Sequence, residues 1–187
     1  MVKSVLDELL KGAPVVLDGA WGTQLQLRGL PVGGCPDEWN LSHPEQVEEV
    51  ARSYVVAGSQ VILTNTFGSN PVTLERHGLA DRVAEINRAG VEISRRAAAG
   101  KARVFASIGP SGVMLMMGDK SPEQLRAAFS VQAEALAHHW AVCIAIVDDG
   151  GHLLWLQRLD GAAPVSAWIG PQKAVTAAIG RRESAVY

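Results

Sequence analysis

The chain has 187 residues, of which 48% are hydrophobic and 19% are charged, and its formal net charge is −2. This length allows one ordinary domain or a domain joined to a fragment, and the composition can build a core. The small net charge gives no reason to expect nucleic acid or an anionic membrane as a partner. No run of residues approaches the roughly 20 apolar residues that span a bilayer, so we expect no membrane partner.

The N-terminal residues 1–12 predict a short amphipathic helix, because Asp7 and Glu8 stand among apolar residues. A signal peptide needs an uninterrupted apolar core, which this segment lacks, so we expect a cytoplasmic location. The two cysteines, Cys35 and Cys143, are far apart in the sequence. A reducing compartment disfavours a disulfide between them.

Three strands and three helices alternate through the first part of the chain. Short apolar runs that end in polar residues or glycine predict strands at residues 15–17, 60–67 and 103–109. A loop rich in glycine and proline is expected at residues 29–41. Apolar positions at helical spacing predict helices at residues 44–57, 79–99 and 121–138. Ser42 and Ser121 are the expected capping residues of the first and the last of them.

This alternation of apolar strands and helices is typical of a parallel sheet, as in TIM barrels and doubly wound folds. Polar residues and glycines collect where each strand ends. They stand at residues 18–19, 64–66 and 107–112. In both architectures the carboxyl ends of the strands form the ligand-binding edge, so we expect a site there.

The pattern changes after residue 139. Two apolar runs are separated by Asp148, Asp149, Gly150 and Gly151. Asp-Gly between apolar runs predicts a hairpin, which is antiparallel. Pro171 then opens a last predicted helix, which is basic at its C-terminal end.

Several segments of the first part resemble the homocysteine S-methyltransferase family. They are DGAWGTQLQLRG, EWNLSHPEQV, AGSQVILTNTFGSN and ASIGPSG, in this order along the chain. The opening motif of the family is DGAMGT. The resemblance implies a (β/α)8 barrel that binds zinc and activates homocysteine as a zinc thiolate for attack on a methyl group. For residues 1–137 we therefore expect an α/β fold, a partial TIM-barrel-like parallel unit of a methyltransferase of methionine biosynthesis.

Five residues of these motifs are candidates for substrate binding. Asp18 can pair with the ammonium group of an amino acid, and the backbone N–H groups of Gly19 and Ala20 can hold its carboxylate. Asn65 and Thr66 are expected beside them at the next strand end. The alternative is a plain β-turn at Asp18, with Asn65 and Thr66 only satisfying backbone groups at the sheet edge.

The chain departs from the family at the metal site. The zinc ligands of the family are three cysteines on late barrel strands, one alone and then an adjacent pair. This chain has no adjacent cysteines and ends before those strands. A free thiol with a pKa of about 8.5 is mostly protonated at neutral pH, so thiol activation needs the metal. We therefore expect no catalytic residue, no metal ligand and no cofactor, and whether the chain is an enzyme stays open.

The residues from Trp140 onward resemble another family, the GlcG/HbpS family of small α/β proteins. The resemblance rests on residues 140–168 and on KAVTAAIGRRES at residues 173–184. Some members of this family bind heme, so heme is a possible ligand of residues 138–187. His152 could then ligate a metal or heme. The alternative is a half-exposed histidine beside a hairpin turn.

The interpretation is a truncated, inactive homocysteine S-methyltransferase-like chimera, with residues 1–137 joined to a GlcG/HbpS-like fragment, residues 138–187. Its small-molecule partner would be a homocysteine-like amino acid, bound weakly if at all. The alternatives are a methyltransferase completed by another chain that supplies zinc, a heme- or ligand-binding module, and a structural chimera. Open strand edges also predict a homo-oligomer.

Overall fold

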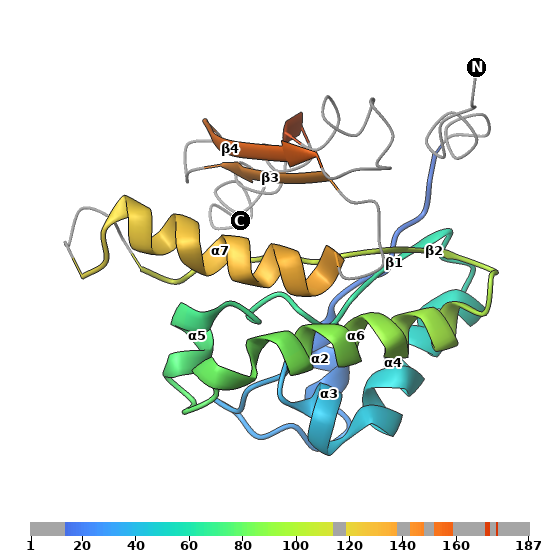
Figure 1. Cartoon of the computed structure of the whole chain (residues 1–187). Helices are drawn as coiled ribbons and strands as arrows, with labels where there is room; N and C mark the ends of the chain where they lie inside the picture. Colours follow the sequence, from blue (N-terminus) through green and yellow to red (C-terminus); the bar gives the residue numbers. More distant parts are fainter. Residues whose placement is uncertain are drawn as a thin grey trace, which may run out of the picture. The chain divides into compact units, whose positions relative to one another are not determined.

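The computed structural model describes residues 14–113, 119–137, 143–147, 152–158, 171–172 and 175. The chain divides into two compact units, a larger one of Leu9–His138 and a smaller one of Met1–Glu8 with His139–Tyr187. Figure 1 shows the elements of each unit. The helix predicted at residues 1–12, the hairpin turn and most of the last predicted helix lie outside the described residues.

The larger unit contains the predicted parallel sheet. Strand β1 (Val61–Leu63) pairs in parallel with β2 (Arg103–Phe105), with Val61 opposite Arg103. The strand predicted at residues 15–17 is reduced to an isolated parallel bridge between Leu17 and Val61. Backbone bonds extend this bridge, because the Gln60 N–H donates to the Val16 carbonyl at 2.8 Å. The order of segments along the sheet therefore follows their order in the chain, as in a β/α barrel.

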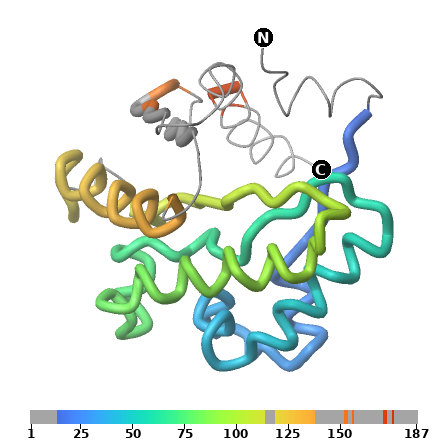
Figure 2. Tube along the Cα trace, turned by 45° about the vertical axis from the view of Figure 1, so that its right-hand side comes forward, coloured from blue at the N-terminus to red at the C-terminus, as the bar shows by residue number. Residues whose placement is uncertain are grey.

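Two long helices contact this sheet and each other. Helices α4 (Pro44–Val56) and α6 (Val83–Ala98) run side by side in Figures 1 and 2. Ile62 of β1 is fully buried and packs against Ala51 of α4 and Ala97 of α6. Small residues at this interface let the helix backbones approach the sheet closely. The apolar stripe predicted for α6 is buried and that of α4 is buried or partly buried, in this cluster and two further ones.

The ends of these helices differ from the prediction in detail. The residue that caps α4 is His43, without a side-chain hydrogen bond, so Ser42 is wrong as the predicted cap. Ser42 is instead the last residue of the short helix α3 (Trp39–Ser42), and its hydroxyl donates to Glu38 Oε2 at 2.8 Å. At the other end of α6, Ala99 adopts a left-handed φ of 46°.

Three short helical elements were not predicted. They are α2 (Trp21–Gln26), α5 (Pro71–Glu75) and the 3-10 turn η2 (Ala80–Arg82). The turn η2 occupies the start of the helix predicted at residues 79–99, so α6 begins only at Val83. The Asn70 side chain caps α5 by accepting a hydrogen bond from the Thr73 N–H at 2.9 Å. Asn before Pro is a helix-start signal that the sequence does contain.

Helix α7 (Pro122–Ala137) follows the prediction closely. The Gln124 N–H donates to Ser121 Oγ at 3.2 Å, and the Ser121 N–H donates to Gln124 Oε1 at 2.8 Å, so the predicted capping box is confirmed. Leu125 and Ala128 of α7 pack against Val72 of α5. This contact joins α7 to the helix that follows β1.

The smaller unit contains the predicted hairpin. Strand β3 (Cys143–Val147) pairs antiparallel with β4 (Leu153–Arg158), and the register shifts once, between Ile146 and Val147. The two strands form a sheet of their own, separate from β1 and β2. That this hairpin belongs to a GlcG-type fold remains a prediction. None of the helices in the described ranges has the length and hydropathy of a transmembrane segment.

Candidate functional site

Asp18 lies at the end of the first predicted strand, where the backbone leaves the sheet. Its N–H donates to the Val61 carbonyl at 3.1 Å, which joins it to β1. Its carboxylate oxygen Oδ2 accepts two hydrogen bonds of 2.7 Å, one from the Leu63 N–H and one from the Trp21 indole Nε1–H. The other oxygen, Oδ1, is shielded from solvent and has no hydrogen-bond partner among the described residues. A shielded carboxylate oxygen without a donor is a group that a ligand donor can satisfy.

The turn after Asp18 is held from one side by α4. The Tyr54 hydroxyl donates to the Ala20 carbonyl at 3.1 Å. A Cβ atom on Gly19 would lie 3.2 Å from that hydroxyl oxygen, so the close approach suits glycine. Gly19 and Ala20 are exposed, and no described residue accepts a hydrogen bond from their N–H groups. These two donors thus lie open beside Asp18.

Asn65 and Thr66 are buried and bonded within the protein. The Asn65 side-chain amide donates to the Pro36 carbonyl at 2.8 Å and to Asn40 Oδ1 at 3.0 Å. The Thr66 hydroxyl donates to the Ser107 carbonyl at 2.8 Å. These bonds match the alternative role, in which both residues satisfy groups at the sheet edge. The structure brings Asp18, Gly19 and Ala20 together in one turn, and the ligand role of all five residues stays a prediction.

Asp37 holds the loop that follows β1, a role that no sequence pattern predicted. Its Oδ1 accepts hydrogen bonds from the Ser69 hydroxyl at 2.6 Å and from the Gly68 N–H at 2.9 Å. Burial raises the pKa of the Asp37 carboxyl above its ordinary value, although the bonds from Ser69 and Gly68 act in the opposite direction. Asp37 lies in a predicted loop, 32 positions from Ser69, so local patterns could not reveal the pair.

The described residues do not form a metal site. Within them, no group of three or more histidine, cysteine, aspartate or glutamate side chains is placed to hold a metal ion. Cys35 is a free thiol, and burial is the main factor that raises its pKa. A raised pKa reduces the thiolate fraction that a zinc ion needs as a ligand. The residues that the structure describes therefore do not fit the zinc site of the family.

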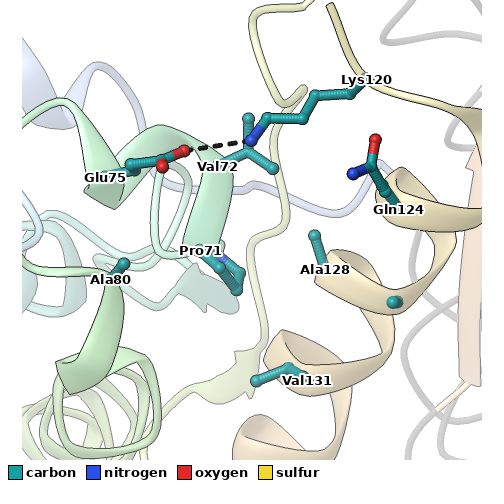
Figure 3. Close-up of a pocket in the computed structure, with 9 residues that line it drawn as sticks. Pro71, Val72, Glu75, Ala80, Lys120, Gln124, Ala128 and Val131 are labelled. Atoms are coloured by element: carbon teal, nitrogen blue, oxygen red, sulfur yellow. Dashed lines mark hydrogen bonds and ion pairs between the residues drawn. The ribbon is translucent and has the colours of Figure 1, made fainter.

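A second surface feature lies between α5 and α7. It is a shallow hollow of about 400 Å³, lined mainly by apolar side chains such as Pro71, Val72 and Val131. Glu75 and Lys120, which both line it, form an ion pair of 3.2 Å, drawn as a dashed line in Figure 3. Its walls offer few polar groups to orient a small ligand, so it is a weaker candidate than the turn at Asp18.

The parallel strands, the helices that contact them and the polar strand end define an α/β protein with a parallel sheet. The family model described as "Homocysteine S-methyltransferase" matches residues 15–156, and the chain belongs to this family. The solved structure of the homocysteine methyltransferase MmuM from Escherichia coli, in its metallated form, is similar in fold. The TM-score is 0.61, the sequence identity is 24%, and the match covers 73% of this chain.

Two relatives represent the two resemblances found in the sequence. Methionine synthase of Mycobacterium tuberculosis is 30% identical over 184 residues, which covers 91% of this chain. Protein GlcG of Escherichia coli (strain K12) is 55% identical over 56 residues, or 30% of this chain. The chain spans 15% of that methionine synthase, 42% of that GlcG and 55% of the MmuM chain. Both predicted resemblances are therefore confirmed, and the chain covers only part of each relative.

Proposed function

We propose that the larger unit keeps the amino-acid-binding end of a homocysteine S-methyltransferase and binds a homocysteine-like amino acid weakly at Asp18. The observation that carries this proposal is the shielded Oδ1 atom of Asp18, which lacks a hydrogen-bond donor among the described residues. A ligand ammonium group would supply that donor together with the opposite charge. The ligand carboxylate would bind to the open N–H groups of Gly19 and Ala20.

We further propose that this chain alone does not transfer a methyl group to homocysteine. The resemblance implies that the family activates the substrate thiol with zinc held by three cysteines, and this chain contains two cysteines. Cys35 is a partly buried thiol with a raised pKa, which does not favour zinc binding. The alternative is an enzyme completed by another chain that supplies the metal site.

Ligand titration tests the binding proposal. L-Homocysteine added to the ¹⁵N-labelled full chain should shift the backbone resonances of residues 18–20 in a saturable way. Asp18→Asn keeps the shape of the side chain but loses the charge, so its affinity should fall about tenfold or more. 2-Hydroxy-4-mercaptobutanoate, which has no ammonium group, should bind the parent and the Asp18→Asn variant equally weakly. Equal affinity of the parent and the Asp18→Asn variant for L-homocysteine would contradict the proposal.

The catalytic part has a separate test. The purified chain, incubated with L-homocysteine, zinc and betaine, should form no methionine above the level of a protein-free reaction. The same mixture with an intact betaine-dependent enzyme is the positive control. Zinc-dependent methionine formation by the chain alone would contradict the proposed inactivity without affecting the binding site at Asp18.

A second candidate function concerns residues 138–187, and the 55% identity to GlcG over 56 residues favours it. We propose that these residues form a GlcG/HbpS-like fragment that is joined to the methyltransferase-like residues 1–137. Through the resemblance stated above, heme or a small ligand is its expected partner. Titration of hemin with the full chain should then shift the Soret band in a saturable way, and His152→Ala should abolish this shift. An unchanged hemin spectrum would leave a structural chimera as the better interpretation.

Self-association is also part of this proposal. In the described part of the larger unit, β2 pairs with β1 alone, and Val16 and Leu17 beside the sheet are 52% and 45% exposed. Unpaired strand edges and exposed apolar side chains favour association with a second copy. Light scattering over a dilution series should show a mass above 19.9 kDa that falls on dilution.

A cytoplasmic location, and the absence of nucleic acid and membrane partners, remain predictions.

A further inference from the structure

We infer that Trp21 is a positioning residue for amino acid binding, because it directs the Asp18 carboxylate toward a ligand ammonium group. This inference rests on the proposed function. It adds the residue that orients the Asp18 carboxylate for binding the ligand. Trp21 is the first residue of α2 and stands three positions after Asp18. In the DGAMGT motif of the resembled family, methionine occupies this place and offers no hydrogen-bond donor.

The geometry assigns different tasks to the two carboxylate oxygens. Oδ2 receives the Trp21 indole N–H and the Leu63 N–H, both at 2.7 Å, which are short bonds typical of a charged acceptor. Oδ1 receives no hydrogen bond from a described residue and is shielded from solvent. With two donors on one oxygen, the carboxylate cannot rotate about its Cβ–Cγ bond without breaking both bonds. Oδ1 is therefore the oxygen that still lacks a donor, and it is the atom to which a ligand ammonium group would donate.

The indole is itself held in place. Trp21 is partly buried and packs against two apolar clusters, together with Tyr54 of α4. Its ring therefore cannot turn freely, and its N–H points in a fixed direction. Leu63 belongs to β1, so the two donors reach Asp18 from a helix and from a strand. Such a pair of rigid supports orders the carboxylate before the ligand arrives, which lowers the entropic cost of binding.

The test compares variants with the full chain in the same titration. Trp21→Phe keeps a packed ring but removes the donor, and its affinity for L-homocysteine should fall about threefold. Affinity for 2-hydroxy-4-mercaptobutanoate should not change, because this ligand has no ammonium group to meet Asp18. In an Asp18→Ala background, Trp21→Phe should cause no further loss, since the two side chains act through one interaction.

Leu27→Ala is the control, because Leu27 is an exposed residue at the far end of α2 and its replacement leaves the turn at Asp18 untouched. It should change the homocysteine affinity by less than about twofold. Trp21→Met carries the residue of the family motif and also lacks the donor. It is the second variant, for use if Trp21→Phe does not fold, and its affinity for L-homocysteine should also fall about threefold.

The outcomes separate the two proposals. Unchanged homocysteine affinity in both Trp21 variants would overturn this inference and leave the proposed function intact. The inference would also be overturned if the Trp21 variants lost as much affinity for 2-hydroxy-4-mercaptobutanoate as for L-homocysteine. The same holds if Trp21→Phe reduced homocysteine affinity as much in the Asp18→Ala background as in the parent. Either result would show that Trp21 only stabilises the turn. If the parent chain does not bind L-homocysteine, the proposed function fails and the inference fails with it.

Discussion

Asn40 and Asn65 bind each other through two reciprocal hydrogen bonds. The Asn40 side-chain amide donates to the Asn65 carbonyl at 2.7 Å, and the Asn65 side-chain amide donates to Asn40 Oδ1 at 3.0 Å. The Asn40 amide also donates to the Ile86 carbonyl at 3.2 Å. Asn40 is 2% exposed, so one buried side chain connects α3, the end of β1 and α6. Because buried backbone carbonyls need donors, this residue holds the loop beside the candidate site.

The first prediction tests that connection. Asn40→Asp should lower the free energy of unfolding by about 3 kcal/mol or more, because a carboxylate oxygen would replace the amide that donates to two buried carbonyls. Urea denaturation of parent and variant measures this difference. Gln26→Glu makes the same chemical change at an exposed position of α2 and should shift stability by less than about 0.5 kcal/mol. Similar losses in the two variants would contradict the role given to Asn40.

The second prediction concerns the contact between α6 and the strand-end loop. A Cβ atom on Gly90 would lie 2.7 Å from Asn40 Nδ2 and 2.7 Å from Thr66 Cγ2. Gly90→Ala should therefore lower the free energy of unfolding by about 1–3 kcal/mol, although alanine is the better helix former. Gly22→Ala in α2 is the control, since its Cβ would meet nothing within 4 Å, and it should be neutral or slightly stabilising. A thermal melt in which both variants gain stability would show that α6 has room at Gly90.

The sequence was sufficient for the long elements of the larger unit and for the place of the candidate site. Helices α4, α6 and α7 have apolar stripes of three or more turns, and such periodicity is a strong signal. The capping box at Ser121 is a local motif, and both of its hydrogen bonds are present. Asp18 was predicted at the sheet edge because it directly follows an apolar run, and the structure places it there.

The remaining features depend on contacts between distant residues. The strand predicted at residues 15–17 is only a bridge at Leu17, because strand pairing depends on a partner that the local sequence does not reveal. Helix α2 has six residues, too few for a periodic pattern. The partners of Asn65 lie 25 and 29 positions away, at Asn40 and Pro36. No pattern of neighbouring residues predicts bonds of this kind.

The third prediction concerns the start of α7. Ser121→Ala removes the side-chain acceptor for the Gln124 N–H and should lower the free energy of unfolding by about 1 kcal/mol. Ser121→Asp retains an acceptor in the same place and should recover most of that loss. Because α7 packs against α5 through Leu125, hydrogen exchange should accelerate first in the N-terminal turn of α7. A Ser121→Ala variant as stable as the parent would show that this helix start does not depend on its cap.

The fourth prediction uses the buried carboxyl of Asp37, whose pKa is raised mainly by burial. An unfolded chain releases this proton near the ordinary value of 3.8, while the folded chain releases it at higher pH. Between these two values the folded state binds more protons than the unfolded state. The contribution of Asp37 to stability is therefore fully present at low pH and is lost as the pH rises through the folded pKa.

Asp37→Asn removes this pH dependence but keeps an oxygen that can accept the bonds from Ser69 and Gly68, both of which now go to Oδ1. The stability of the variant relative to the parent should therefore increase as the pH rises from about 3.5 to about 7. Urea denaturation at several pH values measures the difference, and the titration of all other groups cancels between the two proteins. Ser69→Ala weakens the same contact from the other side, so it should destabilise the loop at every pH. If the difference in free energy of unfolding between Asp37→Asn and the parent stayed constant with pH, the carboxyl would titrate alike in the folded and unfolded chains. Burial would then not govern its ionisation.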